Sequence, residues 1–108
     1  GEAQARFLHL KHGAEAAAKD YIQKHLLEHF SVISKAEAVE LGLFGIPNQP
    51  LSMNSGDRVG DLILFPRTGW TCYAQKRVDA EGRPSVNAGN HGGFSRAEML
   101  IPFLAYRF

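Results

Sequence analysis

His91 lies in a stretch of the chain where small residues surround it. Gly89, Gly92 and Gly93 flank it, and the first bulky side chain that follows is Phe94. Glycine is used where the backbone takes a positive φ angle or comes close to another group, so we expect this imidazole to be presented rather than packed. Neutral imidazole is the commonest metal ligand among side chains. The stretch is therefore a candidate metal-ligand loop, and the alternative is a surface loop in which the histidine has no function.

Two further histidines, His25 and His29, have a spacing that is known from metal sites. With Glu28 between them they read H-x-x-E-H, the signature of inverzincin metalloproteases, and histidines four apart on a helix could hold one zinc ion. A catalytic zinc ion needs a third protein ligand, and no acidic residue nearby is a convincing one. We therefore interpret both imidazoles as part of an amphipathic helix face or its rim, and the match as coincidence.

Aromatic residues and one cysteine offer weaker candidates. Phe65, Trp70 and Tyr73 could form a ligand patch, but alternating aromatic residues on neighbouring strands more often pack in a core. Cys72 is the only cysteine, which excludes an internal disulfide and a zinc site made of cysteines. Because no base lies beside it in the sequence, we expect Cys72 to be a small buried hydrophobic residue.

The composition predicts one small domain, residues 1–108. Twelve Lys and Arg residues against eleven Asp and Glu residues give a net charge of +1, so the sequence shows no basic footprint for nucleic acid or an anionic membrane. No run of eighteen apolar residues occurs, so we expect no transmembrane helix. The chain begins at Gly1 without a preceding methionine, which suggests a piece of a longer protein.

The first half of the chain is predicted to alternate strands and helices. Residues 5–10 resemble a strand that ends in a turn. Apolar residues at spacings of three and four predict a long amphipathic helix over residues 14–29, followed by a short strand over 30–33. An S-x-x-E capping box at residues 34–37 starts a short helix, which we expect to end before Gly42.

The second half is predicted to begin with a long loop over residues 46–56. The continuous apolar run at 62–65 is typical of a strand buried on both faces, and a hairpin turn leads to a returning strand over 70–76. A second capping box at 95–98 precedes an apolar, strand-like run over 99–108. The prediction is an α+β fold: a small mixed or antiparallel sheet of about four or five strands, one long amphipathic helix and one or two short helices.

Several blocks of the sequence resemble a known family when they are taken together. They are GLFG at residues 42–45, RVGDLI at 58–63, and HGGFS at 91–95 with EMLIP at 98–102. In order and spacing they are similar to the C-terminal end of type I phosphodiesterase/nucleotide pyrophosphatase proteins, members of the alkaline phosphatase superfamily. The opening residues 5–11, ARFLHLK, resemble the strand that follows the Asp-His metal motif of that family. The resemblance implies the C-terminal part of an alkaline phosphatase-like α/β fold.

The resemblance also implies a role for His91. In that family the histidine of the closing His-Gly-Gly motif is a ligand of one of two catalytic metal ions, usually zinc. Asn90 and Gly92 would then be neighbouring positions that orient the imidazole, although a turn residue is the simpler interpretation of Asn90. Two divalent ions polarise the phosphoryl oxygen, activate the nucleophile and stabilise the leaving oxygen.

The chain lacks other motifs that the family carries. The parent enzymes have a Thr or Ser nucleophile and Asp-Asp-His groups upstream of the region that matches. With one ligand of about six, a two-metal centre cannot form, so we expect the isolated chain to be inactive.

The expected partners of the chain are the missing N-terminal catalytic part and a phosphate-ester or nucleotide substrate. The alternative is a self-standing α+β module that binds a partner without catalysis. An exposed strand edge could pair two copies into a homodimer.

Overall fold

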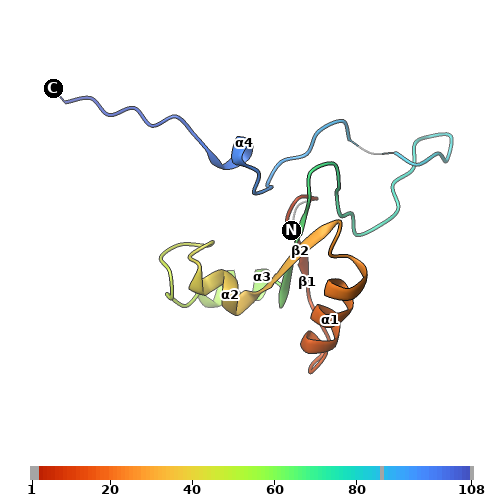
Figure 1. Ribbon diagram of the computed structural model, residues 1–108, viewed down its shortest axis with the longest axis horizontal. Coiled ribbons are helices and arrows are strands. Elements are labelled where there is room, and N and C mark those ends of the chain that lie inside the picture. The colour runs from red at the N-terminus through yellow and green to blue at the C-terminus, as the bar shows by residue number, and fades with distance from the viewer. Residues whose placement is uncertain (1–2, 86, 108) are drawn as a thin grey trace.

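The fold is organised around β3 (Leu62–Pro66), the middle strand of a three-stranded antiparallel sheet. The computed structural model describes residues 3–85 and 87–107. β1 (Arg6–Leu8) pairs with one edge of β3 and β2 (Phe30–Ser34) pairs with the other. The helices are α1 (Glu15–His25), α2 (Lys35–Glu40), α3 (Met53–Arg58) and α4 (Arg96–Met99) (Figure 1). The α+β class that the sequence predicts is confirmed.

The side chains of β3 alternate between two apolar layers, as the pleat of a strand requires. Leu62 and Leu64 pack with Ile22 of α1, whereas Ile63 packs with Ala38 of α2. All five are nearly inaccessible to solvent. Helices therefore cover both faces of the sheet, with α1 on one side and α2 on the other (Figure 1). This arrangement confirms the predicted strand over 62–65 that is buried on both faces.

The capping box at residues 34–37 forms as predicted and starts α2. The backbone N–H of Glu37 donates to the hydroxyl of Ser34 at 3.2 Å, and the Glu37 carboxylate accepts from the Ser34 N–H at 2.7 Å. Lys19 of α1 donates to the same carboxylate oxygen at 2.7 Å. The hydrogen bond from Lys19, followed by those from Ser34, lowers the pKa of Glu37 to about 2. This carboxylate therefore caps α2 and also links it to α1.

We expect the stability of the fold to decrease as the pH falls from about 4.5 to about 2. The pKa of Glu37 is about 2 in the folded chain and 4.5 ordinarily, so its contribution is complete above pH 4.5 and is lost as the folded group protonates. Glu37→Gln should remove this part of the pH dependence. Because the carboxyl is partly exposed and screened, the loss at pH 7 should be about 1 kcal/mol, the size of a cap. Urea denaturation at several pH values measures it.

The matched control is Glu28→Gln, which makes the same change at an exposed residue after α1. It should leave the acid branch of the stability curve as it is in the natural chain. An acid branch that is identical in the Glu37 and Glu28 variants would contradict the assignment.

The predicted long helix over 14–29 is shorter than expected. α1 has 11 residues and ends at His25, with Leu26 as its C-cap. The N–H groups of His29 and Phe30 both donate to the carbonyl of Leu26, at 3.0 and 2.9 Å. This turn is needed because β2 begins at Phe30 and must run antiparallel to β3. The position where β2 pairs, rather than helical periodicity, determines where α1 ends.

The prediction of four or five strands is wrong for the part of the chain that the structure describes, which has three. Residues 70–76 do not return along β3, because β1 and β2 already occupy both of its edges. They lie instead beside the start of β1, where the Cys72 N–H donates to the carbonyl of Ala3 at 2.9 Å. Residues 100–107 are extended but form no strand.

One helix was missed by the sequence analysis. α3 lies partly within the predicted loop over 46–56 and is capped by Ser52, whose hydroxyl accepts from the Ser55 N–H at 3.3 Å. The helix has six residues, includes Gly56 and buries none of its side chains. It therefore has neither the glutamate of a full capping box nor an apolar face, which are the two signals that sequence patterns use.

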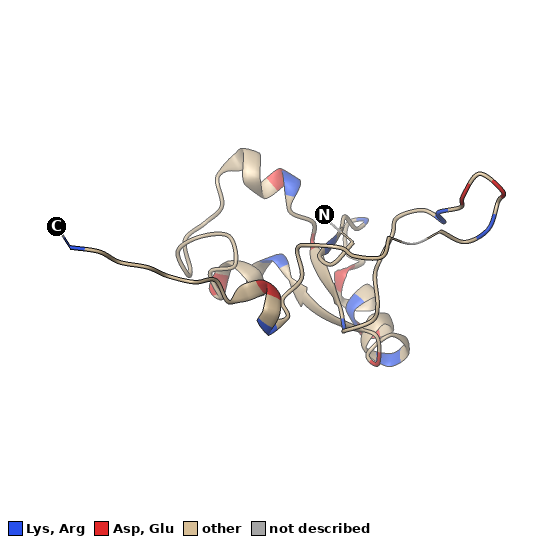
Figure 2. Cartoon of the chain, turned by 90° about the horizontal axis from the view of Figure 1, so that it is seen from above, with Lys and Arg blue, Asp and Glu red and all other residues tan. Residues whose placement is uncertain are grey.

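Charged residues of both signs are interspersed over the elements of the fold (Figure 2). This distribution fits the net charge of +1. Within residues 3–85 and 87–107, no helix is both long enough and apolar enough to cross a membrane.

Candidate functional site

His91 lies in an irregular stretch that connects the central part of the fold to α4. The residue is exposed, whereas Gly93, two positions later, is buried. Gly92 between them has a φ angle of +84°, a left-handed conformation that side chains other than glycine rarely adopt. The predicted presentation of this histidine is therefore confirmed, and its imidazole is accessible to a ligand.

The residues that follow His91 are anchored to the sheet and to α4. The ring of Phe94 stacks on Phe65 of β3, with ring centroids 4.4 Å apart. Glu98 of α4 accepts hydrogen bonds from the N–H of Gly93 at 3.1 Å and from the N–H and hydroxyl of Ser95. The bond from the Ser95 N–H is part of the predicted second capping box, which forms at the start of α4. The bond from the Ser95 hydroxyl is the main cause of the lowered pKa of Glu98, so the carboxylate that holds the loop is ionised at neutral pH.

The absence of a side chain at Gly93 leaves room for this carboxylate. A Cβ atom at the position of Gly93 would lie 2.7 Å from Oε1 of Glu98, which is inside van der Waals contact with the group that accepts the Gly93 N–H. The two glycines after His91 therefore serve different purposes: Gly92 allows the turn, and Gly93 allows the close approach of the carboxylate.

His91 is also one of the residues that line a polar cavity of about 270 Å³. Asn90 accepts a hydrogen bond from the hydroxyl of Tyr73 at 3.0 Å, so its amide oxygen is bound to Tyr73 and not to the imidazole. Arg77 lies over the ring of Tyr73, 5.1 Å from the centroid. Burial acts to raise the pKa of Tyr73, but neighbouring polar groups, among them the positively charged Arg77 guanidinium, outweigh it and the pKa is lowered.

Asn90 is thus an anchoring residue of the loop, and Gly92 contributes through its backbone conformation. The sequence allows two interpretations of Asn90, as a position that orients the imidazole and as a simple turn residue. The side chain of Asn90 accepts its hydrogen bond from Tyr73 and so fixes the backbone next to His91.

No group of three or more His, Cys, Asp or Glu side chains that could hold a metal ion occurs within residues 3–85 and 87–107. A metal ion bound by His91 with three protein ligands would therefore need at least one of them from outside the described residues. The exposed imidazole leaves room for them.

The H-x-x-E-H residues do not form a metal-binding helix face. His25 is the last residue of α1, and His29 lies beyond the turn that follows it. The ring of His25 packs against Tyr21 at 4.6 Å, whereas His29 stacks on Trp70 at 3.8 Å with an angle of 23° between the planes. The two imidazoles have different neighbours, which supports the interpretation of the spacing as coincidence.

The weaker candidates have structural partners. The predicted packing of aromatic residues on neighbouring strands is wrong for Trp70 and Tyr73, because residues 70–76 form no strand. Trp70 instead stacks on His29 and is 46% exposed. Cys72 is partly buried and packs against the apolar layer of α1, as expected for a small hydrophobic residue.

Sequence reasoning missed the basic side chains that surround the cavity, Arg6 and Arg77. They come from β1 and from the irregular segment after β3, and no local pattern marks either residue. Comparison of the chain with protein-family models, curated proteins and solved structures found no match.

Proposed function

We propose that this chain is the C-terminal part of a metal-dependent phosphodiesterase or nucleotide pyrophosphatase, in which His91 is a ligand of a catalytic divalent ion, zinc. The observation that carries the proposal is the exposed imidazole of His91 on a loop fixed by Phe94 and Glu98. The chain would form one end of an α/β fold of the alkaline phosphatase type. The resemblance of the blocks at 42–45, 58–63 and 91–102 supports it.

The loop suits a metal ligand for three physical reasons. An exposed imidazole needs little desolvation to bind a cation. Gly92 and Gly93 carry no side chains, so other ligands could approach the same ion closely. The hydrogen bonds to Glu98 and the stack of Phe94 hold the backbone in place, which lowers the entropy lost when the ligand is fixed. The ion would supply polarisation of the phosphoryl oxygen.

The test on this chain is a zinc titration followed through the histidine resonances in NMR spectra. A single imidazole falls short of the three protein ligands of a catalytic zinc site, so we expect weak binding, with a dissociation constant on the order of 1 mM. The His91 resonances should shift, and His91→Ala should abolish the response. His25→Ala, the same change at the end of α1, should keep it. Tight stoichiometric binding that depends on His25 and His29 would contradict the proposal.

One observation favours the second candidate function, a non-catalytic module that binds a partner protein. Residues 100–107 extend away from the rest of the chain (Figure 1), and their apolar side chains are solvent-accessible, with Leu104 95% and Ile101 81% exposed. Apolar segments of this kind are buried by another polypeptide. In the first function that polypeptide is the N-terminal catalytic part. In the second it is a separate protein or, through an exposed strand edge, a second copy of the chain.

A further inference from the structure

Two segments that are far apart in the sequence form the cavity beside His91. Arg6 extends from β1, and Arg77 comes from the irregular segment that follows β3. The cavity has a volume of about 270 Å³ and is also lined by Asn87 and Asn90. Two arginines, a histidine and two asparagines therefore line the same space.

Both guanidinium groups are held in place by neutral partners. Arg6 donates through Nε and Nη2 to the carbonyl oxygen of Cys72, at 3.2 and 3.0 Å. Arg77 donates through Nη1 to Oδ1 of Asn87 at 3.1 Å and lies over the ring of Tyr73. A carbonyl, an amide and an aromatic ring orient these cations without neutralising their charge.

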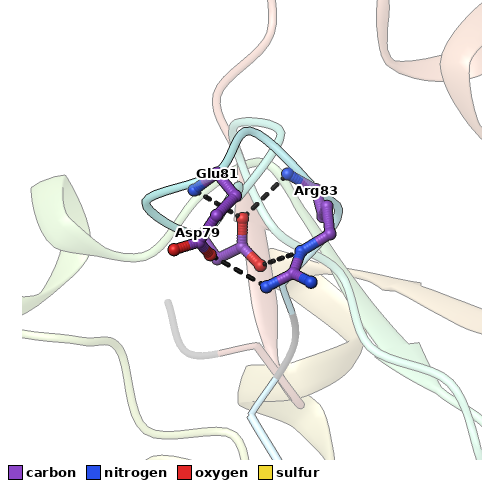
Figure 3. A network of polar contacts seen from close by, with 3 residues as sticks. All are labelled: Asp79, Glu81 and Arg83. Carbon is purple, nitrogen blue, oxygen red and sulfur yellow. Dashed lines mark hydrogen bonds and ion pairs between the residues drawn. The ribbon is translucent and has the colours of Figure 1, made fainter.

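No carboxylate from the described part of the chain lines this cavity or forms an ion pair with Arg6 or Arg77. The contrast within the same segment is Arg83. Its Nε lies 2.8 Å from Oδ2 of Asp79, and its Nη2 lies 2.8 Å from Oε2 of Glu81 (Figure 3). The charge of Arg83 is therefore compensated locally, whereas the charges at the cavity are available to an anion from solution.

We infer that this cavity binds a phosphate group between Arg6 and Arg77. Guanidinium groups present paired N–H donors whose geometry matches phosphate oxygens. Arg6 and Arg77 each have N–H groups beyond those used in the bonds above, since a guanidinium has five donors. The amides of Asn87 and Asn90 complete a polar lining.

The assignment of this phosphate to a substrate rests on the proposed function, because His91 lies on the same cavity. In that case the two arginines would position the phosphate ester against the metal ion held by His91. The binding of phosphate by the cavity itself requires neither the metal ion nor the rest of an enzyme.

The experiment is a titration of the chain with inorganic phosphate at low ionic strength, with a chelator present and sodium chloride at matched ionic strength as the reference. Amide resonances of Asn87, Gly89 and Asn90 should shift with phosphate and not with chloride. Arg77→Gln should weaken binding at least 10-fold. Arg83→Gln removes the same charge from the same segment and should leave the affinity unchanged.

Two further outcomes keep the test decisive. Arg77→Lys retains the charge without the paired donors. It should bind phosphate with an affinity between those of the natural chain and Arg77→Gln, so that weaker binding is seen in a variant that keeps its fold. Equal weakening by Arg77→Gln and Arg83→Gln would overturn the inference, because the net charge of the chain would then explain the affinity. Identical resonance shifts with chloride and with phosphate would also overturn it. Phosphate binding together with a failed zinc titration would leave the cavity assignment intact and remove the proposed enzyme function.

Discussion

On the proposed function, we expect His91→Ala to lower kcat/KM for phosphodiester hydrolysis at least about 100-fold in a polypeptide that also carries the upstream metal ligands. Loss of groups that merely orient a metal ligand already costs about 10- to 100-fold, and loss of the ligand itself should cost more. An ion that His91 is proposed to hold would be bound too weakly in the variant to polarise the phosphoryl oxygen. Steady-state hydrolysis of bis(p-nitrophenyl) phosphate measures the activity, and elemental analysis measures the metal content.

His25→Ala is the matched control for this measurement. It removes an imidazole of the same kind at the end of α1, where the ring packs against the exposed Tyr21. Activity and metal content should stay at the natural level. Full metal content in the His91 variant, or equal losses of activity in both variants, would contradict the assignment of His91 as a ligand.

The parts of the fold that depend on local signals were predictable from the sequence. The apolar run of β3 indicated a strand with two covered faces, because each of its side chains must be buried in one layer or the other. The capping boxes that begin at Ser34 and Ser95 each lie within four residues, so their hydrogen bonds follow from sequence spacing alone.

The parts that depend on distant segments were not predictable in the same way. Residues 70–76 alternate like a strand, but the predicted hairpin with β3 needs a free edge of β3, and β1 and β2 occupy both of them. The apolar run at 100–107 has strand-like composition and no partner strand among the described residues. Periodicity reports the character of the side chains and carries no information about which edges are available.

The candidate site shows the same division between local and distant information. The glycines around His91 indicated an exposed imidazole, because the conformation of a backbone is a local property. The neighbouring arginines could not be inferred, since Arg6 reaches the cavity only after β1 pairs with β3, and Arg77 only after its segment folds back. Residues that only the tertiary structure brings together have no characteristic spacing in the sequence by which the site could be recognised.

The second large prediction concerns the core around β3, where Leu62→Ala should lower the stability of the fold. Leu62 is fully buried and pairs with Leu8 of β1 and Ser34 of β2, so both neighbouring strands restrict the collapse of the cavity that the substitution leaves. We expect the free energy of unfolding to decrease by about 2–5 kcal/mol, a large share of the roughly 5–15 kcal/mol typical of a folded domain. Urea denaturation followed by circular dichroism measures it.

Leu104→Ala makes the same change on a side chain that is 95% exposed, and it should alter the free energy of unfolding by less than about 0.5 kcal/mol. If Leu62→Ala does not fold, Leu62→Met provides the measurement, because a swap that conserves volume costs less than about 1.5 kcal/mol. Similar losses at the two leucines would mean that the layer between α1 and the sheet is not the stabilising core.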